Sequence, residues 1–152
     1  MTSPDRLACQ QLVVFTTEHF TVEGCGTCHI PAYLIVTPKQ AVESLSQMNS
    51  AALASLGPTL AVVTAAIEAI VRAQRVYCAL FSESQNAFGI HFHLFPRTEW
   101  LTAKYFAAHP RDSEISGPRL LNWARLTFQK PISGMNRDET LDKIRAWLGS
   151  RR

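Results

Sequence analysis

The chain has 152 residues, of which 47% are hydrophobic and 18% are charged, and its formal net charge is +3 at pH 7. This composition is ordinary for a soluble globular protein, and a chain of this length buries most of its apolar surface in one core, so we expect a single domain over residues 1–152. The Lys and Arg residues are scattered and lack the basic stripe of a nucleic-acid-binding protein, which argues against a nucleic-acid partner.

Membrane insertion and secretion are not indicated either. No apolar run approaches the length of a bilayer span, and the first residues lack the basic and apolar regions of a secretory signal. The four cysteines are too few for a disulfide-stapled scaffold and are compatible with free thiols in a reducing compartment. We therefore expect a cytoplasmic protein without a membrane partner.

The first half of the chain alternates strand and helix signals. Residues 11–23 are rich in β-branched and aromatic types and predict a hairpin that turns near Thr17 and Glu18. A short loop over residues 24–29 follows, and residues 32–37 read as a buried strand ended by Pro38. From Ser50 to Gln74 apolar residues recur every three or four positions, which predicts a long helix with a kink at residues 53–57, caused by Pro58. The apolar positions of this helix are Leu53, Leu56, Leu60, Val63, Ile67 and Ile70.

The second half begins with another predicted hairpin, made of strands at residues 75–81 and 88–95. Helices are then predicted at residues 101–108 and 118–128, and a last helix begins at Asn136. Asn136 and Glu139 have the spacing of a capping box, and Leu141, Ile144 and Leu148 form its apolar face.

The segment most informative for chemistry is residues 89–97, with the sequence GIHFHLFPR. In a strand, alternate side chains point to opposite faces, so Gly89, His91 and His93 share one face while the apolar residues between them point into the core. Two imidazoles on a rigid strand suit a catalytic site, although two alternating histidines by themselves are more typical of a polar surface.

This segment resembles the signature of the histidine-triad (HIT) superfamily, which is His-φ-His-φ-His-φ-φ with φ apolar, often followed by Pro-Arg. Pro96 and Arg97 fix the register, so His93 takes the third histidine position, His91 the central one and Gly89 the first. Upstream, residues 31–39 (PAYLIVTPK) are similar to the family's Pro-Gly-His-φ-φ-φ-x-Pro-Lys strand. The segment HFHLFPRTEW looks like a bacterial, diadenosine polyphosphate hydrolase-like branch of the superfamily.

The resemblance implies an α+β fold, in which an antiparallel sheet of about five strands carries a long helix across it. We expect a HIT-like core at about residues 12–97 and a helical C-terminal extension at about residues 98–152. The family also implies a homodimer and a small nucleotide substrate, without a cofactor. The implied activity is that of a hydrolase or transferase cleaving at the α-phosphate of a purine nucleotide, such as a dinucleoside polyphosphate or a nucleoside phosphoramidate.

The same resemblance implies roles for individual residues. His91 would attack the α-phosphate and carry a nucleotidyl intermediate, which requires an imidazole that is uncharged near neutral pH. His93 would contact phosphate oxygens or the leaving group. Gln85 matches a Gly-Gln position, with Ser84 in place of the glycine, and would orient the phosphate or the attacking water.

Further substrate contacts are predicted at three charged residues. Glu23 stands where the family often has an acid that binds a ribose hydroxyl. Lys39 and Arg97 would add positive potential near the phosphate. Each of the three is also compatible with an ordinary solvated surface position.

Two departures from the family pattern occur together. The strand that normally carries Gly-His carries Ala32 and Tyr33, and the first triad position is Gly89. We expect the tyrosine ring to fill the space left by the glycine, which would preserve packing and remove a polar pair. The alternative function is then a catalytically weak nucleotide-binding protein.

Cys25 and Cys28 have the Cys-x-x-Cys spacing that forms half of a tetrahedral zinc site, and His29 or His19 are the available further ligands. An ordinary loop with free thiols is the competing interpretation, and we expect no metal. A zinc-dependent module remains the third hypothesis.

Overall fold

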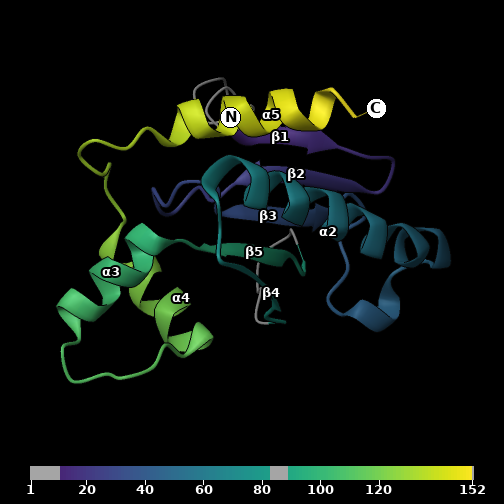
Figure 1. The fold of residues 1–152 in the computed structure, drawn as a ribbon. Helices are drawn as coiled ribbons and strands as arrows, with labels where there is room; N and C mark the ends of the chain where they lie inside the picture. The colour runs from purple at the N-terminus through teal and green to yellow at the C-terminus, as the bar shows by residue number, and fades with distance from the viewer. Residues whose placement is uncertain (1–10, 83–88, 152) are drawn as a thin grey trace, which may run out of the picture.

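The computed structural model describes residues 11–82 and 89–151. In this part of the chain five strands form one sheet in the order β1-β2-β3-β5-β4, with antiparallel neighbours throughout. The strands are β1 (Val13–Thr16), β2 (Phe20–Gly24), β3 (Leu34–Pro38), β4 (Arg75–Leu80) and β5 (Phe92–Arg97). The helices are η1 (Leu45–Gln47), α2 (Ser50–Val71), α3 (Glu99–Ala108), α4 (Gly117–Thr127) and α5 (Arg137–Gly149). The expected α+β fold, with a long helix across an antiparallel sheet, is confirmed (Figure 1).

The predicted N-terminal hairpin forms where the residue pattern placed it. β1 and β2 pair, and Thr17 closes the turn because its hydroxyl accepts a hydrogen bond of 2.9 Å from the amide of Phe20. The next strand, β3, pairs with β2 from Phe20↔Pro38 to Gly24↔Leu34. The first three strands therefore follow one another in both sequence and space.

α2 begins at the cap residue Asn49, whose side chain accepts a hydrogen bond from the amide of Ala52, and it runs through Pro58 as one helix. The predicted apolar stripe is wrong at its beginning, because Leu53 is 41% exposed while Ala52 and Thr59 are buried. The prediction assigned the buried face by the larger side chains, whereas the face of α2 that packs on the core at this end carries the small residues Ala52 and Thr59. By length and composition alone α2 is also apolar enough to cross a membrane, so the expectation that no apolar run approaches that length is wrong. A core helix of a soluble protein passes the same test.

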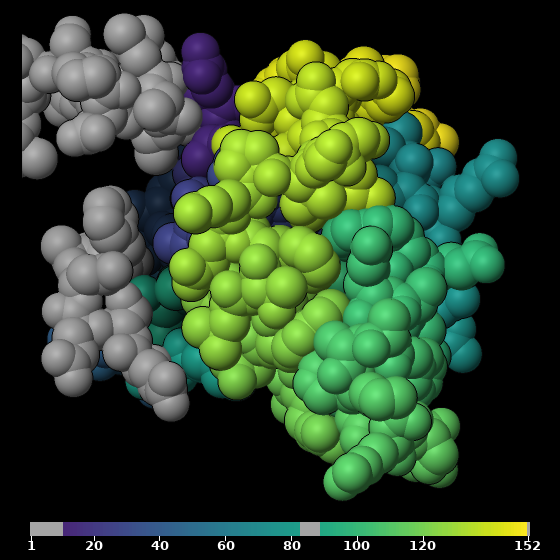
Figure 2. Space-filling model, turned by 90° about the vertical axis from the view of Figure 1, so that its left-hand side faces the viewer, coloured from purple at the N-terminus to yellow at the C-terminus, as the bar shows by residue number. Residues whose placement is uncertain are grey.

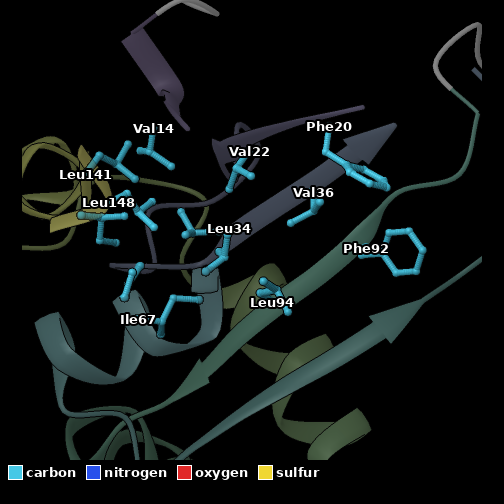
Figure 3. Packing of buried hydrophobic residues seen from close by; sticks show 14 of the residues in the cluster. Val14, Phe20, Val22, Leu34, Val36, Ile67, Phe92, Leu94, Leu141 and Leu148 are labelled. Atoms are coloured by element: carbon cyan, nitrogen blue, oxygen red, sulfur yellow. The ribbon is translucent and has the colours of Figure 1, made fainter. Parts of the chain in front are cut away.

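One hydrophobic core lies between the sheet, α2 and α5. Val22, Leu34 and Leu94 of three strands meet Ile67 of α2 and Leu141 of α5, as Figure 3 shows. α5 is fixed along β1 by Arg145, whose guanidinium donates hydrogen bonds to the carbonyls of Gln11 and Val13. The C-terminal helix is therefore part of the main core, although the sequence suggested that it belongs to an appended extension.

The cap of α5 is only half of the predicted capping box. The Asn136 side chain accepts a hydrogen bond of 3.1 Å from the amide of Glu139, as expected for an N-cap. The carboxylate of Glu139 instead accepts from Nζ of Lys143, one turn further along. An ion pair with its own helix thus replaces the reciprocal half of the box.

A second core lies on the other face of the sheet, under α3 and α4. It gathers Tyr33 and Phe95 from the sheet side, Cys25 and Cys28 from the loop after β2, and the buried residues Leu101, Tyr105, Leu120, Leu121 and Ala124 of the two helices. The C-terminal segment from α3 through α4 to the start of α5 forms the side of the molecule that Figure 2 shows. The extension therefore covers part of the face on which the histidines were predicted.

The predicted strand at residues 88–95 is wrong at both ends. β5 begins at Phe92, because Gly89 has a left-handed backbone (φ +67°) and the amide of Ile90 donates to the carbonyl of Val42 instead of to a neighbouring strand. At the other end the strand includes Pro96. Its missing N–H is tolerated because β5 has already passed the end of β3 and pairs there only with β4.

Truncation of the α5 contact tests this description of the core. Leu141 is 1% exposed, so Leu141→Ala is expected to lower the free energy of unfolding by about 2–5 kcal/mol, through lost burial and the cavity that remains. Leu126→Ala is the matched control, since Leu126 is 65% exposed and its truncation should change stability by less than about 0.5 kcal/mol. Urea unfolding of both variants measures the difference, and equal effects would contradict the placement of α5.

Candidate functional site

His91 and His93 lie side by side at the beginning of β5. His91 directly precedes the strand and is partly exposed, whereas His93 is its second residue and only 5% exposed. Their ring centroids are 4.7 Å apart, and the ring planes are inclined by 60°. The two imidazoles predicted to share a face are thus brought together, with one accessible ring and one enclosed ring.

The enclosed ring of His93 is held by Tyr33. The Tyr33 hydroxyl is 2.7 Å from Nδ1 of His93, which is a short hydrogen bond in a buried environment. Ile35 of β3 and Ala79 of β4 are the cross-strand neighbours of His93, and the ring of Phe81 lies 5.7 Å away. His93 therefore has a fixed ring orientation, and its Nδ1 is not available to a ligand.

The surroundings of His93 keep it neutral. Burial, followed by the neighbouring imidazole of His91 and the guanidinium of Arg125, lowers the pKa of His93 from 6.5 to about 4. At neutral pH one nitrogen of the ring consequently carries the N–H proton and the other accepts, and which nitrogen carries it depends on whether Tyr33 donates or accepts at Nδ1. Such a ring donates or accepts a hydrogen bond but contributes no positive charge.

Tyr33 is the matching neutral partner. Burial raises the pKa of its phenol above the ordinary value, so the hydroxyl keeps its proton. The ring packs edge-on against Phe95 at a centroid distance of 5.1 Å. The expectation that Tyr33 fills the space left by Gly89 is therefore wrong: its ring lies in the second core and its hydroxyl binds His93.

Gly89 is required by the backbone. A Cβ atom at this position would lie 2.2 Å from the carbonyl oxygen of Val42, and φ is +67°. The first triad position of the signature thus lies outside β5 and has no room for a side chain. Ala32 has a positive φ as well, of 61°, at the position where the family pattern has glycine.

The other predicted site residues are placed at different distances from the pair. Glu23 pairs with Ile35 across β2 and β3, and Ile35 pairs with His93, so the three residues form one row on the same face of the sheet. Lys39 is exposed just after β3, at the end of the sheet where β5 begins. Ser84 and Gln85 lie outside the described residues.

Arg97 is not brought to the histidines. It ends β5, four residues beyond His93 and thus roughly 13 Å along the strand, and its guanidinium donates to the hydroxyl of Tyr77. The predicted contribution of Arg97 to a phosphate site has no support from this position. Its Nε is buried without a hydrogen-bond partner in the described part of the chain.

Arg125 is a positively charged neighbour of the buried histidine that the sequence did not indicate. It lies in the last turn of α4, is partly exposed, and its charge acts on His93, Tyr33 and Cys28. Over residues 11–82 and 89–151 its guanidinium has no ion-pair partner. No local pattern in the sequence could have found it, because only the packing of α4 on the sheet brings it to this face.

The two cysteines of the loop after β2 lie close together and are free thiols. The Sγ atoms of Cys25 and Cys28 are 3.2 Å apart, and the Cys28 thiol donates to Cys25. Within the described ranges, no group of three or more His, Cys, Asp or Glu side chains is arranged to hold a metal ion. His29 and His19 therefore do not complete a zinc site with the cysteines in this structure.

The sequence matches no known family model, and no curated protein matches it. Solved structures do match the fold. A hypothetical histidine triad nucleotide-binding protein from Sulfolobus tokodaii has a TM-score of 0.62 and 18% identity, and the match covers 91% of this chain and 84% of that protein. A zinc-bound histidine triad family protein from Mycobacterium smegmatis has a TM-score of 0.61 and 16% identity, over 92% of this chain and 85% of that protein.

A third match is a histidine triad protein from Sinorhizobium meliloti, with a TM-score of 0.55 and 14% identity over 99% of this chain and 96% of that protein. At these identities the likeness establishes the fold. The chain has the HIT fold that its motifs led us to expect.

Gly89→Ala tests the backbone constraint at the first triad position. Gly134 serves as the control, because it also has a positive φ, of +77°, but no atom lies within 4 Å of its would-be Cβ. Gly134→Ala should cost about 1–2 kcal/mol, the ordinary penalty of a left-handed conformation. Gly89→Ala should cost at least about 1 kcal/mol more, because the loop at Val42 must shift. Denaturant unfolding that shows equal losses would contradict this.

The buried neutral state of His93 predicts a pH-dependent stability. The pKa of His93 is lower in the folded protein (about 4) than in the unfolded chain (near 6.5), so between these values the unfolded state binds more protons. Stability is therefore lost as the pH falls from about 6.5 to 4, and this residue contributes about 2–3 kcal/mol of that loss.

His93→Asn keeps a polar atom near the position of Nδ1 but does not titrate in this range. Acidification from pH 7 to pH 4 should therefore destabilise the wild-type protein by about 2–3 kcal/mol more than it destabilises this variant. Equal destabilisation of the two proteins would show that His93 titrates normally in the folded protein.

Proposed function

We propose that this chain, which has the HIT fold, is a nucleotide phosphohydrolase or nucleotidyl transferase that forms a covalent intermediate on His91. The supporting observation is the histidine pair itself: an accessible imidazole, His91, stands 4.7 Å from a buried imidazole that is held rigidly by Tyr33. The proposed substrate is a purine nucleotide cleaved at its α-phosphate, such as a dinucleoside polyphosphate or a nucleoside phosphoramidate. A homodimer and a cytoplasmic location are part of the proposal. The homodimer rests on the family resemblance, and the location rests on the sequence composition and the cysteine usage.

The reaction proposed has two displacements at phosphorus. In the first, the lone pair of a His91 ring nitrogen forms a P–N bond, and the bond from phosphorus to the leaving group breaks, with the electron pair departing on the leaving group. In the second, water attacks the nucleotidyl-His91, the P–N bond breaks, and the mononucleotide is released with His91 restored. Transfer to another acceptor replaces water by that acceptor.

His93 acts in this proposal as a neutral hydrogen-bonding group. Its Nδ1 is occupied by Tyr33, so the other ring nitrogen is the one that can face a phosphate oxygen or the leaving group. When Tyr33 donates to Nδ1, the remaining nitrogen carries the proton and becomes a donor. Tyr33 is thus proposed as a positioning residue that fixes both the ring orientation and the tautomer of His93.

The surrounding charges suit a bound nucleotide. Arg125 supplies positive charge on the face where His93 lies, and Lys39 supplies it at the end of the sheet where His91 lies. Glu23, in the same row as His93 but two strands away, is placed roughly 10 Å from it, a separation that suits a contact with the ribose. Gln85 and Ser84 remain predicted contacts.

The second candidate is a nucleotide-binding protein with little turnover. The feature that favours it is the first triad position, since Gly89 leaves that site without a side chain and has no room for one. Binding alone requires no nucleophile, so the two candidates differ in whether His91 becomes covalently modified.

Turnover of diadenosine tetraphosphate and of an adenosine phosphoramidate tests the proposal, with AMP release as the readout. His91→Ala is expected to reduce kcat by at least about a thousandfold, because it removes the nucleophile. His29→Ala is the control, since this histidine is partly exposed and lies outside the proposed site. Intact mass of the rapidly quenched wild-type protein should show an added adenylyl group that His91→Ala lacks.

Absence of turnover on both substrates, with AMP still raising the melting temperature, would overturn the enzyme in favour of the binding protein. Turnover that persists in His91→Ala would overturn the role of His91.

A further inference from the structure

We propose that Cys25 and Cys28 form a redox-active dithiol that reacts with low-molecular-weight disulfides and closes to an intramolecular disulfide. This site is separate from the nucleotide chemistry proposed above and does not depend on it. The inference rests on the distance between the two sulfurs, on their unequal burial, and on the contacts that hold their loop.

The geometry is close to that of a bond. The sulfurs are 3.2 Å apart, so an S–S bond of about 2.04 Å requires them to approach by roughly 1.2 Å. Small rotations of the two side chains provide such a movement. The alternative that the thiols belong to a zinc site lacks further ligands among residues 11–82 and 89–151.

The backbone on both sides of the pair is already anchored. Nη1 of Arg137 donates to the carbonyls of Cys25, at 3.3 Å, and of Cys28, at 3.4 Å. The amide of His29 donates to the carbonyl of Phe128 at 2.8 Å. The C-terminal extension therefore holds the loop in one conformation with the two sulfurs facing each other. Because the loop is already ordered, closing the disulfide costs little further conformational entropy.

The two thiols differ in access. Cys25 keeps 5% of its surface exposed and is followed by the exposed residues Gly26 and Thr27, whereas Cys28 is fully buried at 0%. Cys25 also accepts the hydrogen bond from Cys28 and lies 3.4 Å from the hydroxyl of Thr27. The hydrogen bond from Cys28, followed by that with Thr27, favours the Cys25 thiolate and lowers the pKa of Cys25 below that of an ordinary thiol, although burial acts in the opposite direction. Cys25 is thus the attacking sulfur and Cys28 the resolving one.

The chemistry balances with a disulfide R–S–S–R as the oxidant. The Cys25 thiolate attacks one sulfur, which forms a mixed disulfide and breaks the R–S–S–R bond, releasing one RS⁻. The thiol of Cys28 then gives up its proton and attacks Sγ of Cys25, and the second R–S leaves and takes that proton as RSH. Two electrons pass from the dithiol to the external disulfide, which is reduced to two thiols.

The dithiol packs against Tyr33, the residue that holds His93. The amide of Cys25 donates to the carbonyl of Tyr33 at 2.9 Å, and both cysteines pack with Tyr33 in the second core. Oxidation replaces the hydrogen-bonded thiol pair beside Tyr33 by a neutral disulfide, and Tyr33 is the residue whose hydroxyl holds His93. The redox state of the loop is therefore expected to act on the same residue that positions the buried histidine.

The test uses the full chain with Cys9→Ser and Cys78→Ser, so that Cys25 and Cys28 are the remaining thiols. The protein is equilibrated in mixtures of reduced and oxidised glutathione, quenched with iodoacetamide and weighed by mass spectrometry. We expect one transition from a doubly alkylated form to a form with no alkyl groups and no bound glutathione. Retention of both alkylated thiols in oxidised glutathione would overturn the proposal, as would one equivalent of zinc that protects them.

Two further variants in that background identify the attacking sulfur. Cys28→Ser should accumulate a stable glutathione adduct on Cys25, whereas Cys25→Ser should form its adduct at least tenfold more slowly, because Cys28 has no exposed surface while Cys25 keeps 5% of its own. Equal adduct rates would overturn the assignment. A thermal melt confirms that each variant is folded. Without substitution at the dithiol, the alkylation rate of Cys25 should fall at a lower pH than the alkylation rate of an ordinary exposed thiol.

Discussion

The hydrogen bond between the Tyr33 hydroxyl and Nδ1 of His93 is the interaction on which the histidine face depends. It joins the residue before β3 to the second residue of β5, two strands that otherwise share only three paired positions. Because both groups are buried, neither can lose its partner without leaving an unsatisfied polar atom, which costs about 1–3 kcal/mol. The bond therefore fixes the ring of His93, and the ring of His91 lies against it at a centroid distance of 4.7 Å.

The position of Tyr33 has its own backbone requirement. Ala32 takes a left-handed conformation, and the amide of Tyr33 donates to the carbonyl of Ile30, so the chain turns tightly just before β3 begins. Glycine adopts this conformation without strain, which gives a physical reason for glycine at this position in the family pattern. Here the turn is kept with alanine, and the extension packs over the tyrosine. The loop of Cys25 and Cys28 thus buries the Tyr33 side chain together with α3 and α4.

Much of this structure could be predicted from local pattern. The N-terminal hairpin, α2, the Asn136 cap and the pairing of two histidines all follow from spacing within a few residues, and each appears in the fold. What could not be predicted depends on distant contacts. The start of β5 is set by the carbonyl of Val42, the exposure of Leu53 by the approach of α2 to the sheet, and the arrival of Arg125 by the packing of α4.

The two departures from the triad pattern, at Gly89 and at Tyr33, have separate physical causes, and neither residue fills space left by the other. Gly89 lies against Val42 before the strand begins, so a histidine there would collide with the main chain of another loop. The polar partner that His93 needs is instead the hydroxyl of Tyr33, the residue before β3. A neutral phenol paired with a neutral imidazole satisfies both groups without a buried charge, which a third protonatable ring would introduce at acid pH. A site with two histidines is thus self-consistent as built: one ring is fixed and neutral, and the other is left accessible for chemistry.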